Sequence, residues 1–213
     1  MAPHFQDEII TIHKLVCGPY GNNTYLLVCP ETNDSILIDT PADPGKMIEL
    51  AKGTNVKAIV ITHNHQDHLL GFDEVTSAIE APVGIGENDA DALDSPPAML
   101  LKDGDEIKAG TITLRAIFTP GHTDGSTCLL IGNHLFTGDT LFPGGPGKTR
   151  SPEHLKQILD SITRKLFSLG DSTNVYPGHG DDGTLKNSKD DYIVYASKDH
   201  PADQSGDVAW LDS

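Results

Sequence analysis

Ile61-Thr62-His63-Asn64-His65-Gln66-Asp67-His68-Leu69-Leu70-Gly71 places three imidazoles and a carboxylate in six consecutive positions, directly after an apolar run. Alternate side chains of an extended segment share one side, so His63, His65 and Asp67 would face together. His68 breaks this alternation. The stretch can therefore present ligands at two different points, which suits two metal ions better than one.

Four apolar runs end in short turns that carry a potential metal ligand: His63, His122, Asp139 and His179. Glycines flank the last three ligands and let the backbone approach closely. Ligands at strand ends would lie on rigid elements and line one edge of a sheet or sandwich. One such histidine is most often an ordinary loop residue. Four such turns, together with the histidine stretch, predict a metal site.

Hydrophobic periodicity and turn residues predict the elements that carry these turns. Strands are expected over residues 9–16, 25–28, 36–38, 56–61, 83–85, 111–118, 127–131, 134–136 and 175–177. Helices are expected over 44–52, 69–79 and 151–169, the last capped by Ser151 and closed by Gly170. Residues 88–105 have the weakest periodicity and are expected to form an exposed excursion with about one helical turn.

Composition restricts the class of protein. A chain of 213 residues that is 37% hydrophobic can form one sizeable core, so we expect a single domain over residues 1–213. The net charge of −16 argues against binding to nucleic acid or to an anionic bilayer. Cys17, Cys29 and Cys128 form no C-x-x-C pair, and no apolar run approaches ~18 residues. We therefore expect a cytoplasmic protein without disulfides and without a membrane partner.

The ligand-bearing motifs resemble the metallo-β-lactamase superfamily and, within it, glyoxalase II-like hydrolases. The motifs are T-H-N-H-Q-D-H from Thr62, P-G-H-T-D-G-S from Pro120, T-G-D-T-L-F from Thr137 and P-G-H-G from Pro177. The resemblance runs from about Gly18 to Gly180 and implies an α/β fold, a four-layer αββα sandwich. It also implies one metal ion held by His63, His65 and His122, a second held by Asp67, His68 and His179, and Asp139 as the bridge.

This ligand set implies a hydrolase. Two bridged ions can share a hydroxide that attacks a carbonyl carbon while a metal polarises the carbonyl oxygen. Asp67 and Asp139 are then the catalytic carboxylates. A thioester is the expected small-molecule substrate, because a thiol of pKa ~8.5 leaves with little protonation. Zn²⁺ is the default metal, although this donor set also accepts Fe or Mn.

Two cations, Lys148 and Arg150, follow the Asp139 segment and are expected to bind an anionic acyl or thiol group of the substrate. Lys148 matches a lysine near the thiol substrate in glyoxalase II, whereas Arg150 replaces an aromatic residue of the family. Glyoxalase II carries a helical C-terminal domain that contacts glutathione, and we expect none after His179, so the resemblance supports glutathione specificity only weakly. The stretch Asn22 to Tyr25 resembles the family's N-terminal strand entry and is expected near the site.

Other functions stay open. The persulfide dioxygenase branch keeps the same motifs and uses a single iron, and a lactonase is another possible hydrolase. Outside enzymology, the chain could be a metal-binding or interaction module with a vestigial site. A flavodiiron-type redox domain is disfavoured, because its second motif position is normally Glu and here it is His65. The motifs predict no oligomeric state.

Overall fold

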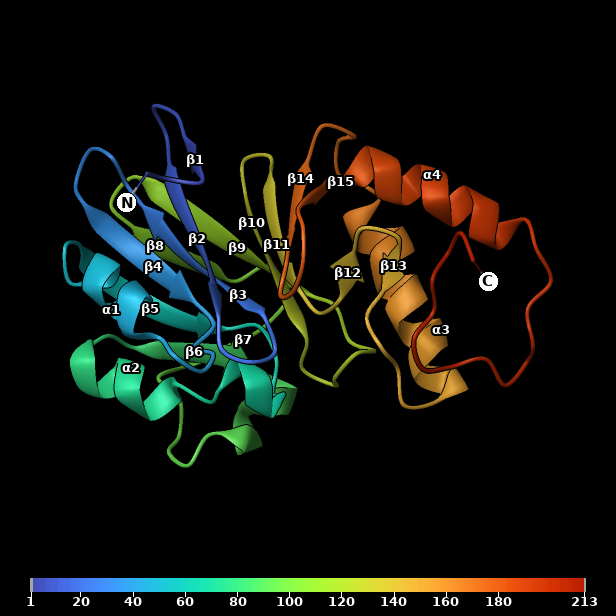
Figure 1. The fold of residues 1–213 in the computed structure, drawn as a ribbon, viewed down its shortest axis with the longest axis horizontal. Coiled ribbons are helices and arrows are strands. Elements are labelled where there is room, and N and C mark those ends of the chain that lie inside the picture. Colours follow the sequence, from blue (N-terminus) through green and yellow to red (C-terminus); the bar gives the residue numbers. More distant parts are fainter. Residues whose placement is uncertain (1, 213) are drawn as a thin grey trace.

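Two β-sheets pack face to face in the computed structural model, which describes residues 2–212 (Figure 1). The N-terminal sheet has its strands in chain order: β1 (Phe5–Gln6), β2 (Thr11–Cys17), β3 (Asn22–Val28), β4 (Asp34–Ile38), β5 (Asn55–Ile61), β6 (Val83–Gly86) and β7 (Met99–Leu101). Strands β1 to β4 are antiparallel, whereas β4 to β7 are parallel. The carboxyl ends of β4 and β5 therefore lie at the same edge.

The C-terminal sheet has the order β15 (Gly183–Thr184), β14 (Asn174–Pro177), β11 (His134–Gly138), β10 (Thr127–Ile131), β9 (Ile112–Phe118) and β8 (Glu106–Ala109). Its one parallel pair is β11 with β14, so the strands that precede Asp139 and His179 end side by side. A small hairpin, β12 (Leu141–Phe142) with β13 (Gly145–Pro146), follows β11. The two sheets join near this edge, where the Thr62 carbonyl accepts the N–H of Thr127 at 2.9 Å.

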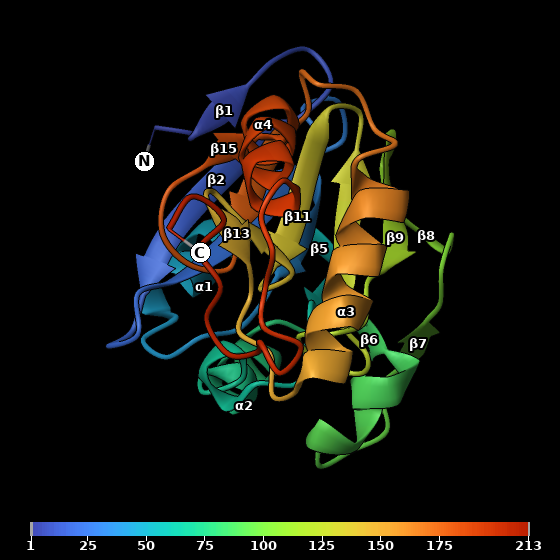
Figure 2. The same ribbon diagram turned by 90° about the vertical axis from the view of Figure 1, so that its right-hand side faces the viewer.

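Helices cover the outer face of each sheet (Figures 1 and 2). The N-terminal sheet carries α1 (Gly45–Ala51) and α2 (Phe72–Ala78), and the C-terminal sheet carries α3 (Pro152–Ser161) and α4 (Leu185–Ala196). Short 3-10 turns occur at Gln66–His68 and Glu87–Ala92. In residues 2–212 no helix has the length and apolar character needed to cross a bilayer.

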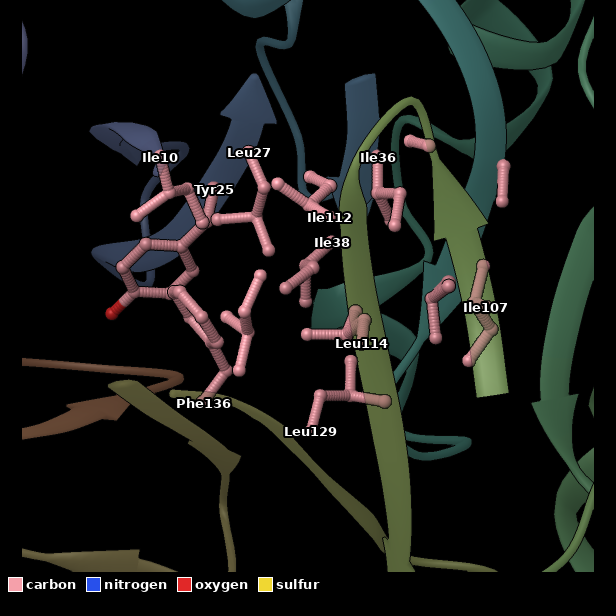
Figure 3. Packing of buried hydrophobic residues seen from close by; sticks show 14 of the residues in the cluster. Ile10, Tyr25, Leu27, Ile36, Ile38, Ile107, Ile112, Leu114, Leu129 and Phe136 are labelled. Carbon is pink, nitrogen blue, oxygen red and sulfur yellow. The ribbon is translucent and has the colours of Figure 1, made fainter. Parts of the chain in front are cut away.

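Three buried apolar clusters correspond to the three contacts between the four layers. The cluster between the sheets includes Leu27, Ile38, Leu114, Leu129 and Phe136, which point toward one another in Figure 3. Each large aliphatic or aromatic side chain buried in this way contributes about 1.5–3 kcal/mol to folding. The predicted αββα sandwich is confirmed, while the single domain over residues 1–213 stays a prediction.

Three element predictions were wrong in part, and one helix was missed. Residues 88–105 contain the strand β7, and β8 follows directly, because Leu101, Ile107 and Ala109 point into the core between the sheets. The helix expected over 69–79 begins only at Phe72, after a 3-10 turn. The helix expected over 151–169 is α-helical to Ser161 and continues as a π-helix. Helix α4 was not predicted, because exposed apolar residues obscure its periodicity.

Candidate metal centre

Seven side chains from four chain segments meet at the edge where the parallel strands end. Three groups have ligand atoms within 4.8 Å of one another: His63 with His65 and His122, His63 with His68 and Asp139, and Asp67 with His68 and His179. Each segment follows a strand directly or after a short turn: β5, β9, β11 and β14. The structure thus brings together all seven residues that the sequence singled out.

The turn at Gln66–His68 divides the histidine stretch into two groups. His65 is extended, with φ −68° and ψ 139°, and the backbone then enters a 3-10 turn. The turn carries Asp67 away from His63 and His65 and places it with His68. Simple alternation put Asp67 beside the first two histidines; this is wrong, because the segment is extended only as far as His65. The prediction of two separate ligand groups agrees with the structure.

Backbone and hydroxyl oxygens hold the Nδ1 atoms of three of these histidines. The contacts are His63 Nδ1 to Thr62 Oγ1 at 3.0 Å, His122 Nδ1 to the Lys148 carbonyl at 2.8 Å and His179 Nδ1 to the Tyr20 carbonyl at 3.1 Å. A partner on one ring nitrogen fixes the ring orientation and leaves the other nitrogen for a metal ion. In all three rings the Nε2 atom therefore faces the cluster.

Three polar atoms inside the cluster are buried and have no hydrogen-bond partner: His63 Nε2, His122 Nε2 and Asp139 Oδ1. A buried polar atom left without a partner costs about 1–3 kcal/mol. Burial lowers the pKa of His63 well below its ordinary value, which keeps the imidazole in the neutral form that binds metals. Imidazole nitrogens and carboxylate oxygens are ligands that Zn, Fe and Mn accept. The residues therefore fit a divalent metal site.

Asp139 lies between the two ligand groups. Its carboxylate oxygens are 3.4 Å from His68 Nε2, 3.6 Å from His122 Nε2 and 3.7 Å from His179 Nε2. Burial raises the pKa of Asp139, but the nearby imidazoles of His68, His63 and His122 outweigh burial and bring it below its ordinary value. Gly178 packs so closely on this carboxylate that a Cβ would overlap it. Asp139 is thus an ionised carboxylate with little freedom to move.

Asp39, which the sequence analysis did not assign to the site, supports His68 from behind. Its carboxylate accepts the Thr62 N–H at 2.8 Å, the Thr62 hydroxyl at 2.9 Å and His68 Nδ1–H at 2.9 Å. Burial lowers the pKa of His68, but Asp39 and Asp139 outweigh it and raise the value to about 10. A sequence signal existed, because the apolar run Ile36 to Ile38 is a fifth strand that ends in a potential site residue.

The expectation that residues 22–25 lie near the site is confirmed. The Asn22 side-chain amide donates to Asp67 Oδ2 at 2.8 Å and is 3.3 Å from His179 Nε2. Asn23 donates to two backbone carbonyls of the loop that carries His179, each at 2.9 Å. These contacts hold Asp67 and His179 in place relative to each other.

A pocket of about 390 Å³ opens beside His65, His122 and Asp139 and is also lined by Lys148 and Arg150. The Arg150 guanidinium donates to Asp124 at 2.7 Å and to His154 Nε2 at 2.8 Å. Lys148 Nζ is 3.7 Å from the Asp207 carboxylate, and both side chains are largely exposed. Exposed pairs of this kind contribute at most about 1 kcal/mol. Both predicted cations therefore lie at the rim of the pocket.

The C-terminal tail is paired with the segment that carries these cations. Thr149 and Gly206 exchange two backbone hydrogen bonds, at 3.0 and 2.9 Å. The backbone N–H of Trp210 donates to the Gly144 carbonyl at 2.8 Å, and the indole side chain is fully buried. The backbone of the pocket rim is therefore held from outside by residues 206–210.

A protein-family profile described as the metallo-beta-lactamase superfamily matches residues 17–179. The chain belongs to this superfamily. The matched range contains all seven clustered side chains. Two curated relatives and one solved structure illustrate where the chain lies within the superfamily.

A hydroxyacylglutathione hydrolase of Polaromonas sp. strain JS666 is 36% identical over 166 residues, which are 75% of this chain and 62% of the relative. The chain thus spans less than two thirds of that enzyme. A probable metallo-hydrolase, YqgX of Bacillus subtilis, is 32% identical over 200 residues, 83% of this chain and 93% of the relative. The crystal structure of ETHE1 from Myxococcus xanthus superimposes with a TM-score of 0.78 at 29% identity, over 88% of this chain and 85% of that one. The chain is thus a glyoxalase II-like member of the superfamily.

Proposed function

We propose that this chain is a metal-dependent hydrolase that cleaves a thioester or related ester, in the manner of glyoxalase II. The observation that carries the proposal is the pair of ligand groups on either side of Asp139, beside a pocket that His65, His122 and Asp139 line and that has two cations at its rim. The relatives named as hydrolases support the reaction class. The pocket is large enough for a small-molecule substrate.

In this proposal His63, His65 and His122 would hold one divalent ion, Asp67, His68 and His179 would hold the second, and Asp139 would be a ligand shared by the two groups. Two ions in such positions would supply a water of lowered pKa as the nucleophile and would polarise the substrate carbonyl. Zn²⁺ is the proposed metal, and the donor set also accepts Fe or Mn. Because several metals fit this donor set, the metal that the protein binds has to be measured.

Charged side chains of the protein are positioned for the reaction by their neighbours. Asp139 stays ionised near neutral pH, because its pKa lies below the ordinary value. Asp67 is oriented by the amide of Asn22. Lys148 and Arg150 would bind an anionic part of the acyl or thiol group at the rim. Binding energy at the rim would hold the scissile carbonyl over the ligand cluster.

Saturation with zinc is expected to load two ions per chain, because the His63, His65 and His122 group and the Asp67, His68 and His179 group share no residue. The measurement is mass spectrometry of the metal content after zinc or manganese loading. His65→Ala and His179→Ala should each lower the content to one ion, since each residue belongs to only one group. His200→Ala, outside the cluster, is the control and should keep two ions. One ion at saturation in both metals would contradict a dinuclear site.

Lys148→Ala is expected to raise KM for a carboxylate-bearing thioester roughly tenfold, equivalent to about 1.4 kcal/mol, and to leave KM for a neutral thioester nearly unchanged. The reason is that a net charge of −16 repels anions unless a cation meets them at the pocket. Raised salt should reproduce the effect. Lys156→Ala is the matched control, since Lys156 is an exposed lysine of α3 that does not line the pocket. Equal effects on the two substrates would remove Lys148 from substrate binding.

A persulfide dioxygenase is the second candidate function, and the structural similarity to ETHE1 is consistent with it. The two functions differ in metal and in co-substrate. Two zinc ions with thioester turnover would support the hydrolase. One iron per chain with oxygen uptake on a persulfide would support the dioxygenase. A panel of both substrates and a lactone on the same preparation separates these outcomes.

A further inference from the structure

Asp89 is a buried carboxylate, 1% exposed, that is not one of the seven clustered residues. It lies in the 3-10 segment Glu87–Ala92 after β6. Its Oδ2 accepts the Asn64 N–H at 3.0 Å and the Thr123 hydroxyl at 2.5 Å, and its Oδ1 accepts the Gly125 N–H at 2.9 Å. Both oxygens therefore accept hydrogen bonds from protein donors.

The partners of Asp89 are the immediate neighbours of the first ligand group. Asn64 lies between His63 and His65, and Thr123 follows His122. These three histidines come from two loops that no strand pairing connects directly. We propose that Asp89 is a positioning residue that ties these two loops together and so sets the metal affinity of the His63, His65 and His122 group. This inference rests on the proposed metal-dependent function.

Close packing shows that this connection is specific. A Cβ on Gly125 would overlap Asp89, and a Cβ on Gly86 would overlap the Gly125 carbonyl. The Ser126 hydroxyl accepts the Thr123 N–H at 3.0 Å and lies 2.7 Å from the Thr123 hydroxyl, which orients that hydroxyl toward Asp89. The loops therefore meet in one arrangement, with a buried charge-assisted hydrogen-bond network at the contact.

Asp89→Asn tests the connection with little change in volume. An asparagine can accept the Gly125 N–H with its oxygen, but its amide would then face the Asn64 N–H and the Thr123 hydroxyl, and the Asn64 N–H would meet a donor in place of an acceptor. The backbone between His63 and His65 would lose its acceptor. Residues that orient metal ligands typically change metal affinity by about 10–100-fold when mutated, so we expect Zn²⁺ binding at the first group to weaken by about tenfold or more.

Two background variants make the test specific to one group. In His179→Ala, which lacks a ligand of the second group, Asp89→Asn should weaken Zn²⁺ binding about tenfold or more. In His65→Ala, which lacks a ligand of the first group, the same change should weaken binding less than about twofold, since Asp89 touches none of Asp67, His68 and His179. Competition with a chromophoric chelator measures both. Equal weakening in the two backgrounds, or none in either, would overturn the proposal.

Two further variants control for folding. Asp105→Asn is the matched control, because Asp105 also accepts a backbone N–H, from Lys102 at 2.8 Å, and it belongs neither to the ligand groups nor to the pocket lining. It should leave Zn²⁺ affinity unchanged.

If Asp89→Asn does not fold, Thr123→Val replaces it, since valine removes one donor to Asp89 and keeps the shape. Thr123→Val should weaken the first group alone, by about threefold, while Thr123→Ser should keep full affinity. If the metal ions bind without any thioester turnover, the proposed function fails while this inference can still hold.

Discussion

Asp139→Ala is expected to lower kcat/KM for a thioester about a thousandfold, equivalent to about 4 kcal/mol of transition-state stabilisation. Asp139 is the one carboxylate of the described cluster that contacts imidazoles of both ligand groups. Its loss should therefore lower occupancy at both metal positions together with hydrolysis. The measurements are steady-state kinetics and metal content on the same preparation.

The controls for this prediction separate charge from shape. Asp139→Asn keeps the shape and removes the charge, and it should lose metal and activity in parallel. Asp160→Ala, an exposed carboxylate of α3 that pairs with Arg164, should change neither quantity. Circular dichroism should report an unchanged fold for all three proteins. Full activity of Asp139→Ala would show that the bridging role is misassigned.

Asp39→Ala is expected to destabilise the metal-free protein by about 3–5 kcal/mol, the usual cost of breaking a buried ion pair. Thr62 and His68 would keep three buried donors without an acceptor. Asp39 also has φ 59°, which an alanine adopts less readily than aspartate or asparagine. Asp39→Asn should therefore cost less, about 1–3 kcal/mol. Urea unfolding in the presence of chelator measures both variants.

The pH dependence of this loss has a definite sign. The folded pKa of His68, about 10, lies above its ordinary value of 6.5, so the ion pair with Asp39 stabilises the fold fully below pH 6.5. The stabilisation fades as the pH rises through 10. The Asp39→Ala loss should be larger at pH 6 than at pH 10. An equal loss at the two pH values would show that the charge of His68 contributes nothing.

The ligands could be predicted from the sequence because each one depends on local pattern. His63, His122, Asp139 and His179 each follow an apolar run and sit in a small-residue turn, and strand ends are fixed by the sheet. The αββα layers follow from the same runs together with the resemblance. Lys148 and Arg150 line the pocket, and their role in substrate binding stays a prediction.

The residues that were missed act only through tertiary contact. Asp89 lies in the stretch with the weakest periodicity, and its partners at 64, 123 and 125 are distant in sequence. Asp39 directly follows a strand, as several of the seven clustered residues do, but its partner His68 is 29 positions away. Strand β7 is only three residues long, too short for alternation to show. The local sequence pattern thus predicts the residues of the ligand groups, and it does not predict the residues that position them.

The pairing of Thr149 with Gly206 makes the pocket rim and the C-terminal tail one cooperative unit in local unfolding. Local unfolding of either segment breaks the two hydrogen bonds between Thr149 and Gly206, so both segments contribute to the free energy of opening. Burial of Trp210 against Phe167 and Tyr192, none of which lines the pocket, adds to that free energy. Ligand binding at the pocket rim and pairing of the C-terminal tail are therefore thermodynamically linked. A ligand that orders Lys148 and Arg150 also shifts the equilibrium of residues 206–210 toward the paired state.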